Sequence, residues 1–230
     1  MKIIEKSSFD ILSPQTMLPV NTPDSDNKSL KEAFVREAKL IELAGRTAYK
    51  SEDKITEDSY IQFINNIRKR DHGAVLEFGS MMVKFTCDRG VSHELVRHRL
   101  CSFLQSSTRY CNYSLDKFGN EITVIRPSTW ESWDSNSRTA WVNAMAKSEE
   151  EYLAMLAAGR QPQEARAVLP NSLMTEIMVR TNFREWLKIF SLRCDKAAHP
   201  DIRALLIPLY KTVHDLLPCV FTIESIDAIL

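Results

Sequence analysis

The order of two repeating patterns is the strongest constraint on how this chain can fold. Apolar residues recur at the spacing of an α-helix through the second half, in residues 137–159, 182–195 and 199–217. The alternation of a half-buried strand is clearest in the first half, at residues 80–88. Strands that come early and helices that come late are typical of the α+β class. We therefore expect a single α+β domain over residues 1–230.

Shorter elements and chain breaks are also visible. Further strands are expected at 2–5 and 120–127, and further helices at 30–50, 58–73, 91–104 and 162–170. The proline-rich segment 13–29 predicts a loop. Pro200 suits a first helical turn, whereas Pro208 predicts a kink or break in the last long helix.

The charge balance argues against several classes of partner. The chain has 30 basic and 30 acidic residues, whereas dedicated nucleic-acid binders usually carry a basic excess. No apolar run approaches the roughly 18 residues of a membrane span, and no signal peptide is recognisable. The five cysteines show no CxxC spacing and are expected to be reduced thiols. We expect a cytoplasmic protein that binds neither nucleic acid nor a membrane.

Residues 93–113, HELVRHRLCSFLQSSTRYCNY, concentrate cations in this neutral chain. One explanation is an ion-pair network on a helix surface, since Glu94 can reach Arg97 at i,i+3 spacing. The other explanation is an anion site. The small polar residues 106–108 favour a turn with accessible N–H groups and hydroxyls, and Arg109 adds a fork of donors that matches phosphate oxygens.

A metal site is not expected in this segment. The string HELVRH resembles the zincin motif but is one residue longer, so on a helix His93 and His98 would lie about 140° apart. The same geometry would turn Arg97 and Arg99 about 200° apart, too far to serve one compact ligand together.

The same segment resembles a family signature. Arg97-His98-Arg99, seven residues and then Ser107 fit the RHRx7S signature of the flavin-dependent thymidylate synthases, and Arg109-Tyr110 fit it too. Three other stretches resemble family segments in the expected order, HGAVLEF (72–78), EARAVLP (164–170) and RTNFREWLKIFSLR (180–193). The resemblance covers roughly residues 35–220. Two positions depart from the pattern, because Phe78 and Ala197 stand where histidines are common.

The resemblance implies the activity and the ligands. The family methylates dUMP to dTMP, with methylenetetrahydrofolate as carbon donor, FADH2 as hydride donor and NADPH as the reductant of the flavin. It uses no cysteine nucleophile, so Cys101 and Cys111 are expected to be packed small residues. The resemblance also implies a small antiparallel or mixed sheet flanked by long helices, and a homotetramer with active sites at subunit interfaces.

The resemblance assigns residues to each ligand. For dUMP it implies Glu94, Arg97, Gln105, Ser106, Ser107, Thr108, Arg109, Arg166 and Arg193. For FAD it implies Ser80, Arg97, His98, Arg99, Gln105, Asn182 and Arg184. Glu94 and Arg97 would reach the nucleotide from a neighbouring subunit. Arg193 is the expected catalytic residue, because a cation over the uracil favours negative charge on the ring and makes C5 more nucleophilic.

Two other readings of the chain remain open. The departures at Phe78 and Ala197 are compatible with a degenerate family member that binds flavin or nucleotide without making dTMP. A nucleic-acid-binding module that uses the same arginines is the second alternative, and the neutral charge weighs against it. Independently of any ligand, Asn182 with Glu185 three residues on predicts a helix capping box.

Overall fold

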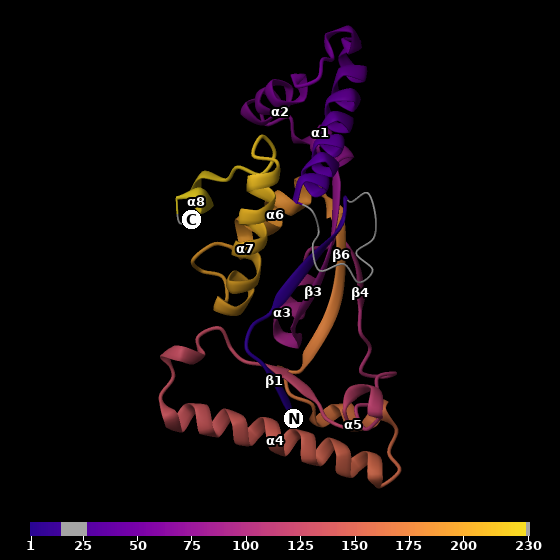
Figure 1. Ribbon diagram of the computed structural model, residues 1–230, viewed down its shortest axis with the longest axis vertical. Helices are drawn as coiled ribbons and strands as arrows, with labels where there is room; N and C mark the ends of the chain where they lie inside the picture. Colours follow the sequence, from indigo (N-terminus) through magenta and orange to yellow (C-terminus); the bar gives the residue numbers. More distant parts are fainter. Residues whose placement is uncertain (15–26, 229–230) are drawn as a thin grey trace. The chain divides into compact units, whose positions relative to one another are not determined.

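The structure, a computed structural model, describes residues 1–14 and 27–228 and mixes helices with small sheets, as predicted for the α+β class (Figure 1). The strands are β1 (Lys2–Ile4), β2 (Ser8–Ser13), β3 (Ser80–Asp88), β4 (Ser102–Gln105), β5 (Thr123–Ile125) and β6 (Met174–Asn182). The α-helices are α1 (Asn27–Tyr49), α2 (Ser59–Lys69), α3 (Arg89–Leu95), α4 (Ser135–Ala157), α5 (Pro162–Ala165), α6 (Phe183–Arg193), α7 (Pro200–Leu216) and α8 (Glu224–Asp227).

The strands form two small sheets. β1 pairs in parallel with β5, with Ile3 opposite Val124. The larger sheet has the order β2-β3-β6-β4. Its two long strands, β3 and β6, run antiparallel, because Phe183 N bonds to Gly79 O at one end while Arg89 N bonds to Leu173 O at the other.

The described residues form two compact units, and β3 and β6 each contribute to both. The first unit comprises Met1–Ser8, Phe85–Arg97 and Phe103–Ile177. The second unit comprises Phe9–Lys84, His98–Ser102 and Met178–Leu230. The single domain over residues 1–230 stays a prediction.

The core of the first unit lies between α4 and the small parallel sheet. Tyr152 of α4 is fully buried in a cluster with Ile122, Val124 and Leu173. The terminal ammonium group of Met1 forms ion pairs at 2.9 Å with Glu121 and with Glu149 of α4. Burial of Val124 and these ion pairs together hold β1 and β5 against α4.

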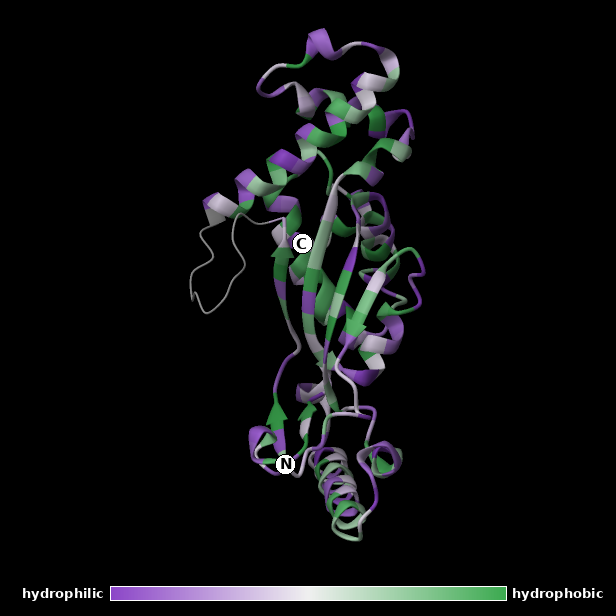
Figure 2. Ribbon diagram, turned by 90° about the vertical axis from the view of Figure 1, so that its right-hand side faces the viewer, coloured by the Kyte–Doolittle hydropathy of each residue, from purple (hydrophilic) through white to green (hydrophobic). Residues whose placement is uncertain are grey.

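The core of the second unit is aromatic. Phe34 of α1 stacks on Phe183 of α6, with ring centroids 5.9 Å apart, and Phe221 meets both rings edge-on. Trp186 stacks on Phe190 along α6. Rings bury more apolar area than any other side chains, so this cluster fixes α6 in its unit. Figure 2 shows the hydrophilic face that α1 keeps in addition to its apolar one.

The expected helix at 91–104 is wrong over most of its length. Helix α3 ends at Leu95, and residues 102–105 form strand β4 beside β6. Pairing with a neighbouring strand satisfies the backbone groups of 102–105 and overrides their local helical pattern. The helical angles predicted for Arg97 and Arg99 therefore do not apply, since both follow the end of α3.

Other boundaries also differ from expectation. Strands β2 and β6 were not expected, and α2 ends at Lys69, before a 3₁₀ helix at Gly73–Phe78. The loop expected at 13–29 is shorter, because Ser13 ends β2 and α1 begins at Asn27; residues 15–26 lie outside the described residues. Of the kink or break predicted at Pro208, the break is absent, because helix α7 continues through this residue, and the kink stays a prediction. Ala204, whose carbonyl loses its helical partner there, is exposed, so solvent can satisfy that carbonyl.

Candidate functional site

The site residues predicted from the sequence fall into two groups, one in each unit, and each group has its own geometry. The first unit holds Glu94, Arg97, Gln105, Ser106, Ser107, Thr108, Arg109 and Arg166. The second unit holds Ser80, His98, Arg99, Asn182, Arg184 and Arg193.

In the first unit, the end of β4 is fixed by hydroxyl groups. The Gln105 amide donates to Ser92 Oγ at 2.9 Å and to Thr175 Oγ1 at 3.0 Å. Ser106 Oγ lies 2.9 Å from the same Thr175 hydroxyl, and Ser106 N donates to Glu176 O at 2.9 Å. Because Ser92 and Thr175 are buried, these bonds hold the backbone that enters the following turn in one conformation.

A tight turn follows β4 and carries the remaining small polar residues. Ser107 O accepts from Cys111 N at 2.8 Å, and Ser107 Oγ accepts from Arg109 N at 3.2 Å. Arg166, just after α5, donates from Nη1 to Thr108 Oγ1 at 3.5 Å. Two hydroxyls and a guanidinium group therefore gather at one turn, which is the chemistry of an oxyanion or phosphate site.

Arg109 belongs to the same turn. Its Nε donates to Gln163 Oε1 at 3.0 Å, and its guanidinium group lies 5.4 Å from the ring centre of Tyr110. The side chain is exposed, so it is oriented by neutral partners while its charge remains accessible to an anion.

Helix α3 begins with a cap and ends before the arginines. Asp88 accepts from Val91 N at 2.8 Å and caps the helix. Glu94 is half-buried near the end of α3, and Arg97 is exposed two residues beyond that end.

In the second unit, His98 and Arg193 are in direct contact. Arg193 Nε donates to His98 Nε2 at 3.0 Å, and the carboxyl oxygen Oε1 of Glu185 lies 3.7 Å from His98 Nδ1. His98 is only 5% exposed. Burial, followed by the charge of Arg193, lowers the pKa of His98 below its ordinary value, which favours the neutral ring.

Three of the remaining residues of this group lie at the start of α6 or of β3. Asn182 accepts from Glu185 N at 2.9 Å and caps α6, as predicted, although the Glu185 side chain faces His98 instead of completing a capping box. Arg184 Nη1 donates to Glu77 Oε1 at 2.6 Å. Ser80 N donates to Glu37 Oε2 at 2.8 Å, and Arg99 is exposed.

Burial makes four cysteine thiols poor nucleophiles. It raises the pKa of Cys87 and Cys194 to about 12 and that of Cys101 and Cys219 to about 11. A thiol that stays protonated at neutral pH is a weak nucleophile. Among residues 1–14 and 27–228, no three His, Cys, Asp or Glu side chains are grouped to hold a metal ion.

Several polar residues that support the two groups were not assigned to the site from the sequence, although Glu185 was predicted as half of a capping box. Ser92, Gln163 and Thr175 support the residues of the first unit, and Glu185 faces His98 in the second. Thr175 and Gln105 are 70 positions apart. Their pairing depends on β4 lying beside β6, a neighbour relation that local patterns do not encode.

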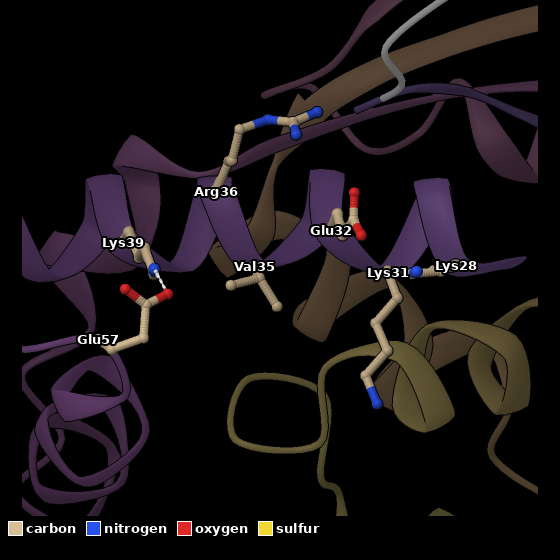
Figure 3. Close-up of a pocket in the computed structure, with 7 residues that line it drawn as sticks. All are labelled: Lys28, Lys31, Glu32, Val35, Arg36, Lys39 and Glu57. Atoms are coloured by element: carbon tan, nitrogen blue, oxygen red, sulfur yellow. Dashed lines mark hydrogen bonds and ion pairs between the residues drawn. The ribbon is translucent and has the colours of Figure 1, made fainter.

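A pocket on α1 lies apart from the predicted site residues. It has a volume of about 490 Å³ and is lined by Lys28, Lys31, Glu32, Val35, Arg36, Lys39 and Glu57. Figure 3 shows Lys39 paired with Glu57 at one end, at 2.5 Å. In the described parts of the chain, no helix is long and apolar enough to cross a membrane.

Comparison with known proteins shows which family the chain resembles. Residues 30–219 match the family described as thymidylate synthase complementing protein. A flavin-dependent thymidylate synthase from Geobacter sulfurreducens is 31% identical over 188 residues, which cover 79% of each chain. Another from Corynebacterium efficiens is 32% identical over 196 residues, covering 79% of this chain and 77% of its own.

A solved structure shares the fold. The UMP/dUMP methylase PolB from Streptomyces cacaoi, solved with bound 5-Br dUMP, superposes with a TM-score of 0.70 at 20% identity, covering 96% of this chain and 95% of its own. The family match spans most of the chain, and relatives above 30% identity cover more than two thirds of it. The chain therefore belongs to the flavin-dependent thymidylate synthases.

Proposed function

We propose that the chain catalyses the reductive methylation of dUMP to dTMP, with methylenetetrahydrofolate as carbon donor and NADPH as the source of reducing equivalents. The observation that carries the proposal is the turn after β4, where Ser107 Oγ, Thr108 Oγ1 and the guanidinium groups of Arg109 and Arg166 gather in one unit. The dUMP analogue named with the related methylase supports a nucleotide monophosphate as the ligand.

The phosphate of dUMP is assigned to this turn. Arg109 and Arg166 supply charge, and the hydroxyls of Ser107 and Thr108 supply donors, which suits a dianionic phosphate. Gln105 and Ser106 hold the strand that leads into the turn through Thr175. By the family resemblance, Glu94 and Arg97 meet the nucleotide from a neighbouring subunit of a homotetramer.

The donor set of the remaining residues fits FAD, whose diphosphate needs cations. Arg97 and Arg99 are both exposed, and the described part of the chain gives neither guanidinium group a hydrogen-bonding or ion-pairing partner. We assign FAD to these two arginines together with Ser80, Gln105, Asn182 and Arg184, and the resemblance adds His98. When bound in its reduced form, the flavin supplies the hydride.

Arg193 is the proposed catalytic residue. Its guanidinium group is half-buried at the end of α6, where a positive charge would stabilise negative charge that develops on the pyrimidine ring. The raised pKa of Cys101 supports a reaction without a thiolate nucleophile. The homotetramer and the cytoplasmic location are likewise proposals from the resemblance.

The first test separates the proposed enzyme from a degenerate member of the family. The purified protein should show a flavin absorbance band and release FAD on denaturation. With methylenetetrahydrofolate and NADPH, it should release tritium from dUMP labelled at C5. A protein that holds FAD without releasing tritium would be the degenerate member, and a colourless protein that takes up no FAD would contradict the proposal.

The second test addresses the phosphate site. Arg109→Ala should weaken dUMP binding about 10- to 100-fold, because charge-assisted hydrogen bonds contribute about 1.5–3 kcal/mol. Calorimetry should show no such loss for deoxyuridine, which lacks the phosphate. Arg160→Ala, an exposed arginine of the same unit, is the matched control. An equal loss for both ligands would move the phosphate away from Arg109.

A further inference from the structure

His98 lies between two charged side chains of α6. Glu185 and Arg193 are eight positions apart on this helix, a spacing that keeps both on one broad face. Arg193 Nε lies 3.0 Å from His98 Nε2, and Glu185 Oε1 lies 3.7 Å from His98 Nδ1. The imidazole ring of His98 thus lies close to one side chain from the start of α6 and one from its end.

The direction of the first hydrogen bond fixes the protonation of the ring. A guanidinium N–H can only donate, so His98 Nε2 must present a lone pair to Arg193 Nε. A neutral imidazole with a lone pair on Nε2 carries its proton on Nδ1, the nitrogen that faces Glu185. Burial and Arg193, acting together, lower the pKa of His98 and favour this neutral form.

Burial of the Glu185 carboxyl group is unfavourable in free energy. The residue is 4% exposed, and its Oε1 has no hydrogen-bond partner within the described residues. A buried carboxyl oxygen without a hydrogen bond is unfavourable unless nearby charge compensates. Here the charge of Lys188, whose Nζ lies at 3.6 Å, supplies that compensation, and the N–H dipole of the neutral His98 ring, with Nδ1 at 3.7 Å, adds to it.

The backbone around His98 is held by a hydrogen bond to β6 and by a hydrogen bond within a local turn. Leu100 O accepts from Thr181 Oγ1 at 2.9 Å, and His98 O accepts from Cys101 N at 3.2 Å. Asn182 caps the helix that carries Glu185 and Arg193. Ring and helix are thus fixed independently, which restricts the distance between His98 Nε2 and Arg193 Nε.

We infer that His98 is a positioning residue that orients the Arg193 guanidinium group through Nε2, while the nearby negative charge of Glu185 favours the proton on Nδ1. The inference rests on the proposed function, because the group that Arg193 is oriented to meet is the uracil of dUMP. His98 acts through Arg193 in this role, whatever contact it makes with flavin.

A pH dependence follows from this arrangement. Protonation of Nε2 removes the acceptor and places two cations side by side, so Arg193 is released as the pH falls through the lowered pKa of His98. The charged groups that face the ring are Arg193, Glu185 and Lys188. Glu185 favours the protonated ring, so Glu185→Gln should move the release to still lower pH.

The test compares two substitutions of the ring by dUMP calorimetry. His98→Gln can place its carbonyl oxygen near the position of Nε2 and keep an acceptor for Arg193, whereas His98→Asn reaches only the position of Nδ1. We expect His98→Asn to weaken dUMP binding about tenfold and His98→Gln no more than about threefold, as for one hydrogen bond. Equal losses in the two variants would overturn the inference.

The pH dependence gives a second readout. The phosphate of dUMP itself titrates near pH 6, so the comparison is between wild type and His98→Gln, which share that contribution. Below the ordinary histidine value of about 6.5, wild type should lose about tenfold more affinity than His98→Gln. Coinciding profiles, or a wild-type loss that Glu185→Gln moves to higher pH, would contradict the inference.

Nitrogen NMR of ¹⁵N-histidine-labelled protein separates this inference from the proposed function. The signals that disappear in His98→Gln identify His98 among the five histidines. They should report a proton on Nδ1 and a bare Nε2 at neutral pH, even if the protein neither binds dUMP nor makes dTMP. A proton on Nε2 would overturn the inference and leave the proposed function untouched.

Discussion

Arg193→Ala should lower the rate of dTMP formation about 10²- to 10³-fold, the usual effect of removing one donor that stabilises transition-state charge. The side chain is half-buried at the end of α6, and its Nε is oriented by His98 at 3.0 Å. A guanidinium group held in advance loses little freedom when charge develops on the substrate. Its removal should therefore affect turnover more than the affinity for dUMP.

The measurement is tritium release from C5-labelled dUMP, accompanied by thermal unfolding of each variant. Arg193→Lys keeps the charge but not the planar donor that meets His98, so its rate should lie between those of wild type and alanine. Lys196→Ala removes an exposed cation just beyond α6 and should leave turnover near wild type. A wild-type rate for Arg193→Ala in a folded protein would remove the catalytic assignment.

The elements with a complete apolar period were predictable from the sequence. Strand β3 has the expected bounds, 80–88, and its alternation matches the burial of Met81 and Val83. Helices α4, α6 and α7 each begin and end within two residues of expectation. In β3, α6 and α7 one face is buried along the whole length, so the local pattern and the tertiary packing favour the same structure, whereas α4 buries only Met145 and Tyr152.

Prediction failed where pairing with a distant segment decides the structure. Residues 102–104 belong to the segment expected to be helical, yet residues 102–105 form β4, and residues 174–182 form the unexpected strand β6 beside it. The bond from Gln105 to Thr175 depends on this pairing. Local propensity carries no information about which strand lies alongside, so neither the strand nor its hydroxyl partners could be anticipated.

For the candidate site, the family resemblance supplied the predicted residues but not the contacts that support them. The family resemblance named His98 from the RHRx7S signature and Arg193 from the segment 180–193, but it did not indicate that their side chains touch. Asn182 and Glu185 were predicted to cap α6 reciprocally, and only the Asn182 half of that cap forms. A glutamate can serve at the third position of a capping box or as the electrostatic partner of a histidine. The spacing of Asn182 and Glu185 alone therefore could not show that Glu185 faces His98.

Trp186→Ala should reduce the free energy of unfolding by about 3–5 kcal/mol, the cost of deleting a large buried ring. Trp186 is fully buried, stacks on Phe190 with centroids 5.6 Å apart, and donates from Nε1 to Met81 O at 3.1 Å. The substitution therefore leaves a cavity beside α6 and removes the donor to a carbonyl of β3. Because native domains are stable by only about 5–15 kcal/mol, this loss is a large share of the total.

One further substitution separates the contributions of the ring and the hydrogen bond, and a second serves as a control. Trp186→Phe keeps an aromatic ring against Phe190 but leaves Met81 O without its donor, so it should cost about 1–3 kcal/mol. Ser191→Ala, at an exposed position of the same helix, should stay within about 0.5 kcal/mol of wild type. Urea unfolding followed by circular dichroism, at one protein concentration, avoids both the lost fluorescence and any effect of association. If Trp186→Ala cost no more than Ser191→Ala, α6 would not depend on this ring for its place in the core, and the orientation of Glu185 and Arg193 would need another support.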